Sequence, residues 1–433
     1  MKNSASLLQI TLMLSILFAP VAYAQNSGVK DDVGFAYLKN LTNLRELNLS
    51  FTTISDAELS NVSGLTKLRV LRLDGTEITD AGLVYLKGLT NLSELNLNDT
   101  KITDEGLREL EHLKNLRQLN LSYTVTTDLG LVNLKGLTNL MGLDLSYTAV
   151  SDEGLIYLGD LTNLSRLNLS YTALTDTGMR YLARFTELRN LELAGTGVSS
   201  AGLRHLENLS GLRVLNLYGT RIEDEGLYYL TELKGLTELY LGKTGVTDNG
   251  IDYLVKLTIL RELDLADTAI TDKGLKKLAK LENLTGLYLA NTEISDKGAG
   301  HIADLCHLIR LNLAGTGITD TGLRDLAGMI KLTELDLGRT SISNPGLLYL
   351  SGFVELRKLY LNGTGISDAG LVHLGSLVNL TELDLSGTKI TDKGIGKLKP
   401  LSGLQWLMLQ DTEISADGVE ELQQVLPGCK IKR

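Results

Sequence analysis

Cysteine, proline, aromatic residues and clustered positive charge are all scarce in this chain of 433 residues. Two cysteines are too few for a disulfide framework or a four-thiolate zinc site, and four prolines are too few for a proline-rich spacer. The formal net charge of −10 comes without a basic patch, which argues against a nucleic-acid partner because phosphate binding needs clustered cations. The chain instead has 44 glycines and a leucine every few residues, which predicts one short motif used many times.

The first 24 residues differ in kind from the rest. Lys2 is their only charge, an apolar run extends from Leu7 to Val21, and Ala22-Tyr23-Ala24 places small residues two apart. This layout is typical of a Sec-type signal peptide, and its apolar core is too short for a membrane-spanning helix. We expect cleavage near Ala24 and a secreted or periplasmic product. Residues 430–433 add no apolar tail, so no transmembrane anchor is expected.

Threonine recurs at a fixed spacing through the rest of the chain. It occupies one position in sixteen successive steps of 24 residues, and leucine stands three residues before it each time. These threonines are Thr52, Thr76, Thr100, Thr124, Thr148, Thr172, Thr196, Thr220, Thr244, Thr268, Thr292, Thr316, Thr340, Thr364, Thr388 and Thr412. One repeat, residues 92–113, reads Leu-x-x-Leu-x-Leu-x-x-Thr-x-Ile-Thr-Asp-x-Gly-Leu-x-x-Leu-x-x-Leu. A fixed period of this length predicts a stack of repeats.

The hydrophobic period changes halfway through each repeat. Leu95 and Leu97 alternate with polar neighbours, which predicts a short strand with one buried face. Leu107, Leu110 and Leu113 stand three apart, which suits one face of a short helix or 3-10 segment. We therefore predict an α/β solenoid of horseshoe form, with a parallel sheet on the concave face and the helical segments on the convex face.

On these residues the chain resembles the leucine-rich repeat family from Asp32 to its end. The Ile-Thr-Asp-x-Gly-Leu step and the ending Leu-Pro-Gly-Cys-Lys-Ile at residues 426–431 are similar to secreted bacterial and ribonuclease-inhibitor-like members. The resemblance implies protein or surface binding. The expected organisation is a signal peptide at residues 1–24, a linker at 25–31, a repeat domain at 32–426 with a half repeat and sixteen full repeats, and a capping strand at 427–433.

Two polar positions of the repeat are expected to be structural. Aspartate precedes the helical segment in thirteen of sixteen repeats, where we expect it to cap the helix, with Ser200, Asn344 and Ala416 in the other three. A calcium ladder is the alternative, but the Gly-rich Asp repeat of calcium-binding β-helices is missing. The threonine of the 24-residue series is expected to turn inward and bond backbone groups in a ladder along the solenoid.

The two cysteines are not expected to pair. Cys306 and Cys429 are 123 residues apart in sequence, which is about five repeats. At the spacing of stacked strands this is on the order of 25 Å, whereas a disulfide needs Cα atoms within about 7 Å. Both cysteines are therefore expected to be small buried apolar side chains.

The strand positions that alternate with buried leucines predict the binding face. In the second half of the chain this face mixes acids with tyrosines, whose large stiff rings carry a polar tip suited to recognition. The candidate ligand-binding residues are Tyr218, Glu238, Tyr240, Glu262, Asp264, Tyr288, Arg310, Asp336 and Tyr360. A second candidate is a ladder of tyrosines at the rim of the concave face, formed by Tyr123, Tyr147 and Tyr171.

No catalytic constellation and no metal-ligand cluster stand out, so neither an enzyme nor a cofactor is expected. Bacterial ubiquitin ligases with such repeats carry a separate catalytic domain with a nucleophilic cysteine, and here every segment is assigned to the repeats or the signal. We predict a non-enzymatic secreted protein that binds a protein partner through its concave face. Binding of a glycan or envelope polymer, or a structural role in the envelope, is the alternative. The sequence leaves the oligomeric state open.

Overall fold

The computed structural model describes residues 21–23 and 35–433. They group into two compact units, Met1–Leu212 and Arg213–Arg433, and each is described by itself. The expected signal peptide and linker lie outside the described residues, apart from Val21–Tyr23. Within the described part of the chain, no helix is long and apolar enough to cross a membrane.

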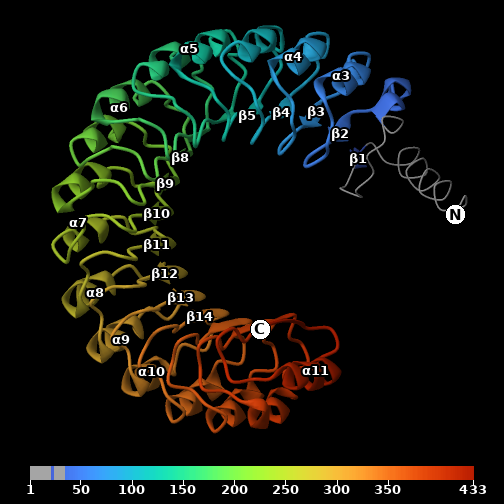
Figure 1. The fold of residues 1–433 in the computed structure, drawn as a ribbon. Coiled ribbons are helices and arrows are strands. Elements are labelled where there is room, and N and C mark those ends of the chain that lie inside the picture. The colour runs from blue at the N-terminus through green and yellow to red at the C-terminus, as the bar shows by residue number, and fades with distance from the viewer. Residues whose placement is uncertain (1–20, 24–34) are drawn as a thin grey trace, which may run out of the picture. The chain divides into compact units, whose positions relative to one another are not determined.

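In Met1–Leu212, each repeat contributes a three-residue strand and a short helical segment (Figure 1). The strands, each paired in parallel with the next, are β1 Val21–Tyr23, β2 Glu46–Asn48, β3 Val70–Arg72, β4 Glu94–Asn96, β5 Gln118–Asn120, β6 Gly142–Asp144, β7 Arg166–Asn168 and β8 Asn190–Glu192. The α-helices are α3 Asp56–Leu59, α4 Asp80–Leu83, α5 Asp128–Leu131 and α6 Asp176–Leu182. The 3-10 segments are η1 Leu38–Asn40, η2 Ser60–Val62, η3 Val84–Leu86, η4 Gly106–His112, η5 Val132–Leu134, η6 Gly154–Leu158 and η7 Gly202–Leu206.

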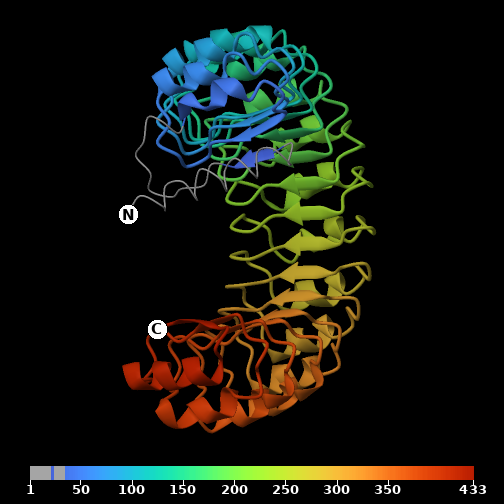
Figure 2. The same cartoon turned by 90° about the vertical axis from the view of Figure 1, so that its right-hand side faces the viewer.

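Arg213–Arg433 continues the same pattern, and Figure 2 shows its strands side by side in yellow to orange. The strands, again paired in parallel, are β9 Val214–Asn216, β10 Glu238–Tyr240, β11 Glu262–Asp264, β12 Gly286–Tyr288, β13 Arg310–Asn312, β14 Glu334–Asp336, β15 Lys358–Tyr360, β16 Glu382–Asp384, β17 Trp406–Met408 and β18 Lys430–Lys432. The α-helices are α7 Ile251–Leu254, α8 Asp272–Leu278, α9 Asp296–Ile302, α10 Asp320–Leu326 and α11 Ala416–Val425. The 3-10 segments are η8 Asp224–Leu230, η9 Gly346–Gly352, η10 Gly370–Ser376 and η11 Asp392–Leu398.

The predicted alternation of strand faces is confirmed. In β10, Leu239 is fully buried while Glu238 and Tyr240 on either side are half-buried. Paired strands match residues 24 apart, as Leu239 and Leu263 do, so each repeat position forms a column of equivalent side chains. The leucine columns form the core between the strands and the helical segments, where each fully buried side chain contributes about 1.5–3 kcal/mol.

The threonine column turns inward as predicted, but it does not link repeats. In all sixteen repeats the threonine hydroxyl donates to the carbonyl oxygen three residues earlier, at 2.5–2.7 Å, as Thr100 does to Leu97 at 2.6 Å. Because both atoms belong to one repeat, the predicted ladder along the solenoid is wrong. The bond instead closes the turn that follows each strand.

The aspartate column makes the ladder between repeats, so its predicted role as helix cap is wrong. The carboxylate of Asp272 accepts the backbone N–H of Ser295 at 2.9 Å and its hydroxyl at 2.6 Å. The cap of α9 is Ser295 itself, whose Oγ accepts the N–H of Lys297 at 3.4 Å. The aspartate is already the first helical residue, one position too late to cap. Thirteen aspartates bridge to the next repeat in this way.

The glycine of the Asp-x-Gly step makes room for this bridge. A Cβ atom on Gly298 would lie 2.5 Å from Oδ1 of Asp272, which belongs to the preceding repeat. The same close approach recurs at the equivalent glycine throughout both units, for example at Gly106 against Asp80 at 2.3 Å. Each residue of the Thr-Asp-x-Gly step therefore has its own role. The threonine caps the helix, the aspartate accepts hydrogen bonds from the next repeat, and the glycine leaves space for the aspartate of the previous repeat.

The residue before each threonine of the series has a left-handed backbone. All sixteen have φ between 51° and 67°. Six are glycine and four are Asp or Asn, which tolerate this conformation, but the other six are Phe51, Tyr123, Tyr147, Tyr171, Lys243 and Arg339. The N–H of Tyr123 donates to the carbonyl of Ser146 in the next repeat at 3.1 Å, and this inter-repeat bond helps to fix the conformation.

The structure corrects one of the two cysteine assignments. Cys429 is buried as predicted, and burial raises the pKa of its thiol. Cys306, however, is exposed, because it stands in the loop between α9 and β13 at a position where most other repeats have threonine, serine, lysine or glutamate. No disulfide joins the two.

Two glycines of α9 provide a test of the inter-repeat bridge. Gly298→Ala should lower the free energy of unfolding by about 2 kcal/mol, since the new methyl group must displace the Asp272 carboxylate from its hydrogen bonds. Gly300→Ala meets nothing within 4 Å and should raise it by about 0.5–1 kcal/mol through helix propensity. Urea unfolding followed by circular dichroism measures both, and equal effects of the two substitutions would contradict the bridge.

Candidate functional site

The sheet carries the predicted site residues on its exposed face. All nine ligand-binding candidates lie within Arg213–Arg433, on or just after strands β9 to β15. Eight of them are half-buried with access to solvent, namely Tyr218, Glu238, Tyr240, Asp264, Tyr288, Arg310, Asp336 and Tyr360. Glu262 differs, because only 8% of its surface is exposed. The nine residues therefore lie on the same face of the sheet, but Glu262 is much less accessible to solvent than the other eight.

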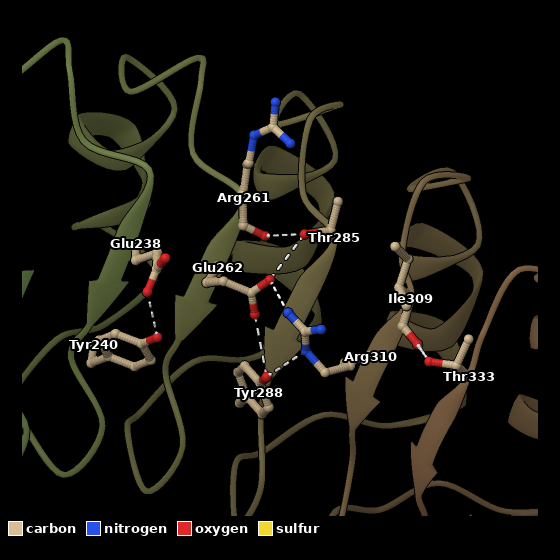
Figure 3. A network of polar contacts seen from close by, with 9 residues as sticks. All are labelled: Glu238, Tyr240, Arg261, Glu262, Thr285, Tyr288, Ile309, Arg310 and Thr333. Atoms are coloured by element: carbon tan, nitrogen blue, oxygen red, sulfur yellow. Dashed lines mark hydrogen bonds and ion pairs between the residues drawn. The ribbon is translucent and has the colours of Figure 1, made fainter. Parts of the chain in front are cut away.

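Glu262 is the centre of a closed polar network (Figure 3). It forms an ion pair with Arg310, and it accepts hydrogen bonds from the Tyr288 hydroxyl at 3.2 Å and the Thr285 hydroxyl at 2.9 Å. Arg310 also donates through Nε to the Tyr288 hydroxyl at 3.0 Å. Both carboxylate oxygens of Glu262 are thus occupied, so the prediction of this residue as an open ligand contact needs correction.

A glycine between the two charged residues makes this network possible. The strand register aligns Glu262 with Gly286 and Gly286 with Arg310. A Cβ atom on Gly286 would lie 1.8 Å from Oε2 of Glu262. Because the middle strand has no side chain here, two residues 48 positions apart in sequence meet across it. The ion pair is a consequence of Gly286.

The tyrosines beside this network are neutral hydrogen-bond donors. Tyr240 donates to Oε2 of Glu238 at 3.0 Å, and burial together with that carboxylate raises the pKa of Tyr240 well above its ordinary value. Burial and the nearby Glu382 carboxylate raise the pKa of Tyr360 in the same direction. At neutral pH these groups offer hydroxyl and ring, not charge.

The predicted aspartates of the face already serve the backbone. Oδ1 of Asp264 accepts the N–H of Ala266 at 2.8 Å, and Oδ1 of Asp336 accepts the N–H of Gly338 at 2.9 Å. The same bond two residues ahead is made by Asn48, Asn96, Asn120, Asp144, Asn168, Asn216, Asn312 and Asp384. Burial raises the pKa of both Asp264 and Asp336. Each therefore has a structural role that the sequence analysis did not assign.

The rim tyrosines form a continuous stack, within Met1–Leu212. The rings of Tyr123 and Tyr147 are 4.2 Å apart and inclined by 13°, and those of Tyr147 and Tyr171 are 4.4 Å apart and inclined by 18°. Hydrogen bonding with Tyr123 raises the pKa of Tyr147. The three residues are 52%, 42% and 43% exposed. Both faces of the middle ring, Tyr147, are thus covered by its neighbours, while all three tyrosines remain accessible to solvent.

A hollow of about 420 Å³ lies on the exposed sheet face of strands β4 to β8. Its polar lining consists of Glu94, Asn96, Gln118, Asn120, Asp144, Arg166, Asn168, Asn190 and Glu192. Gly142 lies in the middle strand of the lining, and the Gln118 side chain fills the space beside it, since a Cβ atom on Gly142 would lie 2.0 Å from Oε1 of Gln118. Strands β5, β6 and β7 of the lining belong to the same three repeats as the tyrosine stack, and the whole lining lies within residues 94–192. Sequence reasoning missed this hollow.

The charges of the hollow are unevenly paired. Glu94 forms an ion pair with Arg72 at 2.7 Å, and Asp144 accepts from Asn168 at 3.1 Å. Arg166 has no ion-pair partner among residues 35–433. Asp144 and Glu192 likewise form no ion pair among those residues, so the lining combines one cation and two carboxylates outside ion pairs with several amide groups that can donate or accept hydrogen bonds.

Groups of three or more potential metal ligands are missing from the part of the chain that the structure describes. The thiol of Cys306 lies 3.6 Å from Nδ1 of His307, which leaves that pair without further ligands. The aspartates that a calcium ladder would use are engaged in the inter-repeat bridges.

Models of the leucine-rich repeat match most of this architecture. One model for the leucine rich repeat matches residues 66–125, and one for leucine rich repeats in two copies matches residues 354–400. A third matches residues 40–57, 136–159, 160–183, 256–279, 304–327 and 328–351. Together they cover more than half of the chain. The chain belongs to the leucine-rich repeat family.

Solved leucine-rich repeat structures have the same fold. A leucine-rich repeat protein of Leptospira interrogans is 22% identical, with 100% of this chain and 99% of that one covered and a TM-score of 0.56. The TLR13–ssRNA13 complex is 19% identical over 90% of this chain and 70% of that one, with a TM-score of 0.52. A TDR receptor is 17% identical over 87% and 70%, with a TM-score of 0.50. No curated protein sequence matches the chain.

The backbone role of Asp264 can be separated from its charge. Burial raises the pKa of this carboxyl, so the folded protein holds its proton more tightly than the unfolded chain, and stability is lost as the pH rises through the ordinary aspartate range. Asp264→Asn keeps the acceptor for Ala266 and removes the charge. It should melt above the parent at pH 7, with the difference shrinking as the pH falls to about 4.

Asp264→Ala is the matched control, because it removes the acceptor as well. It should cost about 1 kcal/mol relative to Asp264→Asn at either pH. Thermal unfolding at the two pH values measures both variants. An asparagine variant that is less stable than the parent at pH 7 would show that the charge stabilises this site.

Proposed function

We propose that this leucine-rich repeat protein is a non-enzymatic, exported binding protein that recognises a protein partner through its exposed sheet face. The observation that carries the proposal is the presence, within residues 94–192, of a polar hollow and a stack of three exposed tyrosines. Leucine-rich repeat folds commonly mediate protein–protein recognition, and aromatic residues and arginine are enriched at binding hot spots. The nine candidates of strands β9 to β15 form a second part of the proposed surface. Several of their polar groups already have hydrogen-bond or ion-pair partners within the chain.

The backbone at the tyrosines supports a functional role for them. A bulky residue with positive φ costs on the order of 1 kcal/mol, and ten of the other thirteen repeats place glycine, aspartate or asparagine at this position, the exceptions being Phe51, Lys243 and Arg339. Tyr123, Tyr147 and Tyr171 carry this cost in three successive repeats. Stacking recovers about 0.5–1.5 kcal/mol per ring pair. A site that spends stability on exposed rings is typical of a contact surface.

The ring arrangement favours a protein over a glycan. A saccharide stacks on an open aromatic face, but here the face of Tyr147 is covered on both sides by Tyr123 and Tyr171. The middle of the stack therefore offers its edge and hydroxyl, and the strands of the same repeats carry Arg166 and amide groups. This mixture suits the side chains and backbone groups of a protein.

Binding is also favoured over catalysis by the state of the acidic side chains. Glu262 is fully paired, and Asp264 and Asp336 each accept a backbone N–H, so none is a free general base. Export rests on the sequence alone, from the signal-peptide pattern of residues 1–24.

The proposal is tested by a binding screen of the chain from Gln25 onward, against proteins of its own envelope and a panel of polysaccharides. The variant is Tyr123→Asn, Tyr147→Asn and Tyr171→Asn together. It should bind the captured protein at least about tenfold more weakly, because the contact rings are gone. Its melting temperature should change little, since asparagine tolerates the left-handed backbone and thereby offsets the lost stacking.

The matched control is Tyr228→Ala, which removes a tyrosine that is 57% exposed on η8, away from the strands. It should bind as the parent does. If the triple variant binds the captured protein as tightly as the parent does, the contact does not involve the tyrosine stack. Retention of a polysaccharide instead would support the glycan alternative, and no binding of either kind would support a structural role.

A further inference from the structure

Four successive repeats have an exposed apolar side chain where the other repeats are polar. The position is the second residue of the loop that leads from each helical segment to the next strand. It is occupied by Cys306, Ile330, Val354 and Val378, which we call the apolar strip. In the other twelve repeats the residue is threonine, serine, lysine or glutamate. Cys306 is exposed, and Ile330, Val354 and Val378 are 56%, 50% and 56% exposed.

The strip is continuous in space. Strands β13, β14, β15 and β16 pair in register, and the helical segments α9, α10, η9 and η10 contact one another in the same order. The loops between them therefore stack as well. The side-chain amide of Asn379 donates to the carbonyl oxygen of Val354 at 2.8 Å, which holds Val378 beside Val354.

Small residues border the strip along its whole length. The two positions that precede each buried loop residue are occupied by Ala303, Asp304, Ala327, Gly328, Ser351, Gly352, Ser376 and Gly375. Asp304 is their only charge, and a Cβ atom on Gly328 would meet nothing within 4 Å. The apolar side chains thus stand beside a low, almost uncharged border that another surface can approach closely.

The charges that follow the strip are self-complementary. Lys331 comes directly after Ile330, and Glu355 comes directly after Val354. Both side chains are exposed and neither forms an ion pair among residues 35–433. A two-fold axis passing midway between Ile330 and Val354 would place Lys331 opposite the partner's Glu355, and Glu355 opposite the partner's Lys331.

We propose that the apolar strip is a self-association surface, at which two copies of this chain pack antiparallel with Ile330 of each against the partner's Val354. The two-fold arrangement is isologous, so each contact occurs twice. It covers the exposed apolar side chains and pairs both free charges. The surface lies on the loops and not on the sheet face, so it leaves the proposed binding face open. The strip would bury less surface area than a standard protein–protein interface. We therefore expect weak dimerisation, with a dissociation constant in about the micromolar range or above.

The test uses charge reversal, with the purified protein kept reduced so that Cys306 cannot crosslink. Sedimentation velocity of the parent over micromolar to sub-millimolar concentrations should show a monomer–dimer equilibrium. Lys331→Glu alone and Glu355→Lys alone should each raise the dissociation constant at least about tenfold, because both pairs become repulsive. Neither change lies in the core, so both variants should fold.

Two further samples identify the partner as a second copy. The double variant Lys331→Glu with Glu355→Lys should dimerise as the parent does. An equimolar mixture of the two single variants should form a mixed dimer, since one supplies only glutamates and the other only lysines at the paired positions. Lys297→Glu on α9, away from the strip, is the charge control and should leave the equilibrium unchanged.

Ile330→Asp provides an independent check of the apolar contact and should abolish the dimer while leaving circular dichroism unchanged. A parent that stays monomeric throughout the concentration range would overturn the proposal. So would single reversals that leave the dissociation constant unchanged, or a mixture that fails to associate.

Discussion

The interaction on which the rest of the structure depends is a carboxylate in one repeat that accepts both the N–H and the hydroxyl of a serine or threonine in the next. Strand pairing links successive repeats along the sheet, but the helical segments have no backbone ladder of their own. The Asp272 to Ser295 bridge and its twelve counterparts supply one. In helices such as α8 and α9 the bridge also fixes the start of the helix, since the bonded hydroxyl of Thr271 or Ser295 is the helix cap. The glycine three residues after each cap is needed because the carboxylate passes through its side-chain space.

Much of the fold could be predicted from the sequence, because one pattern is repeated sixteen times. The 24-residue period placed the strands, the alternation of Leu95 and Leu97 assigned the faces, and the spacing of Leu107 and Leu110 placed the helical segments. The role of the aspartate could not be predicted in the same way. Helix capping is a local preference, whereas the actual partner is 23 residues away, and only three-dimensional stacking brings it within reach. The exposure of Cys306 was missed because its residue type suggests burial but its column faces solvent.

The candidate site was predictable in outline and not in detail. The sequence placed Tyr123, Tyr147 and Tyr171 side by side, and the structure confirms that they are neighbours. One feature depended on a missing side chain. Gly286 lets Glu262 reach Arg310, and this predicted contact residue is therefore only 8% exposed. A glycine at an outward strand position, between long polar residues in the neighbouring repeats, is the signal that could have found it. The hollow gave no such signal, because it is formed by side chains of five strands that only the fold brings together.

The left-handed residue of each repeat has a consequence for how such a protein can change. Its backbone conformation is fixed by a bond to the next repeat, and its side chain points away from the core, so the residue type can vary while the architecture is retained. The chain already places phenylalanine, lysine, arginine and tyrosine there beside glycine, aspartate and asparagine. New binding specificity can therefore evolve, or be engineered, by substitutions along this column, one repeat at a time. The packing of the repeats beneath the column remains unaltered.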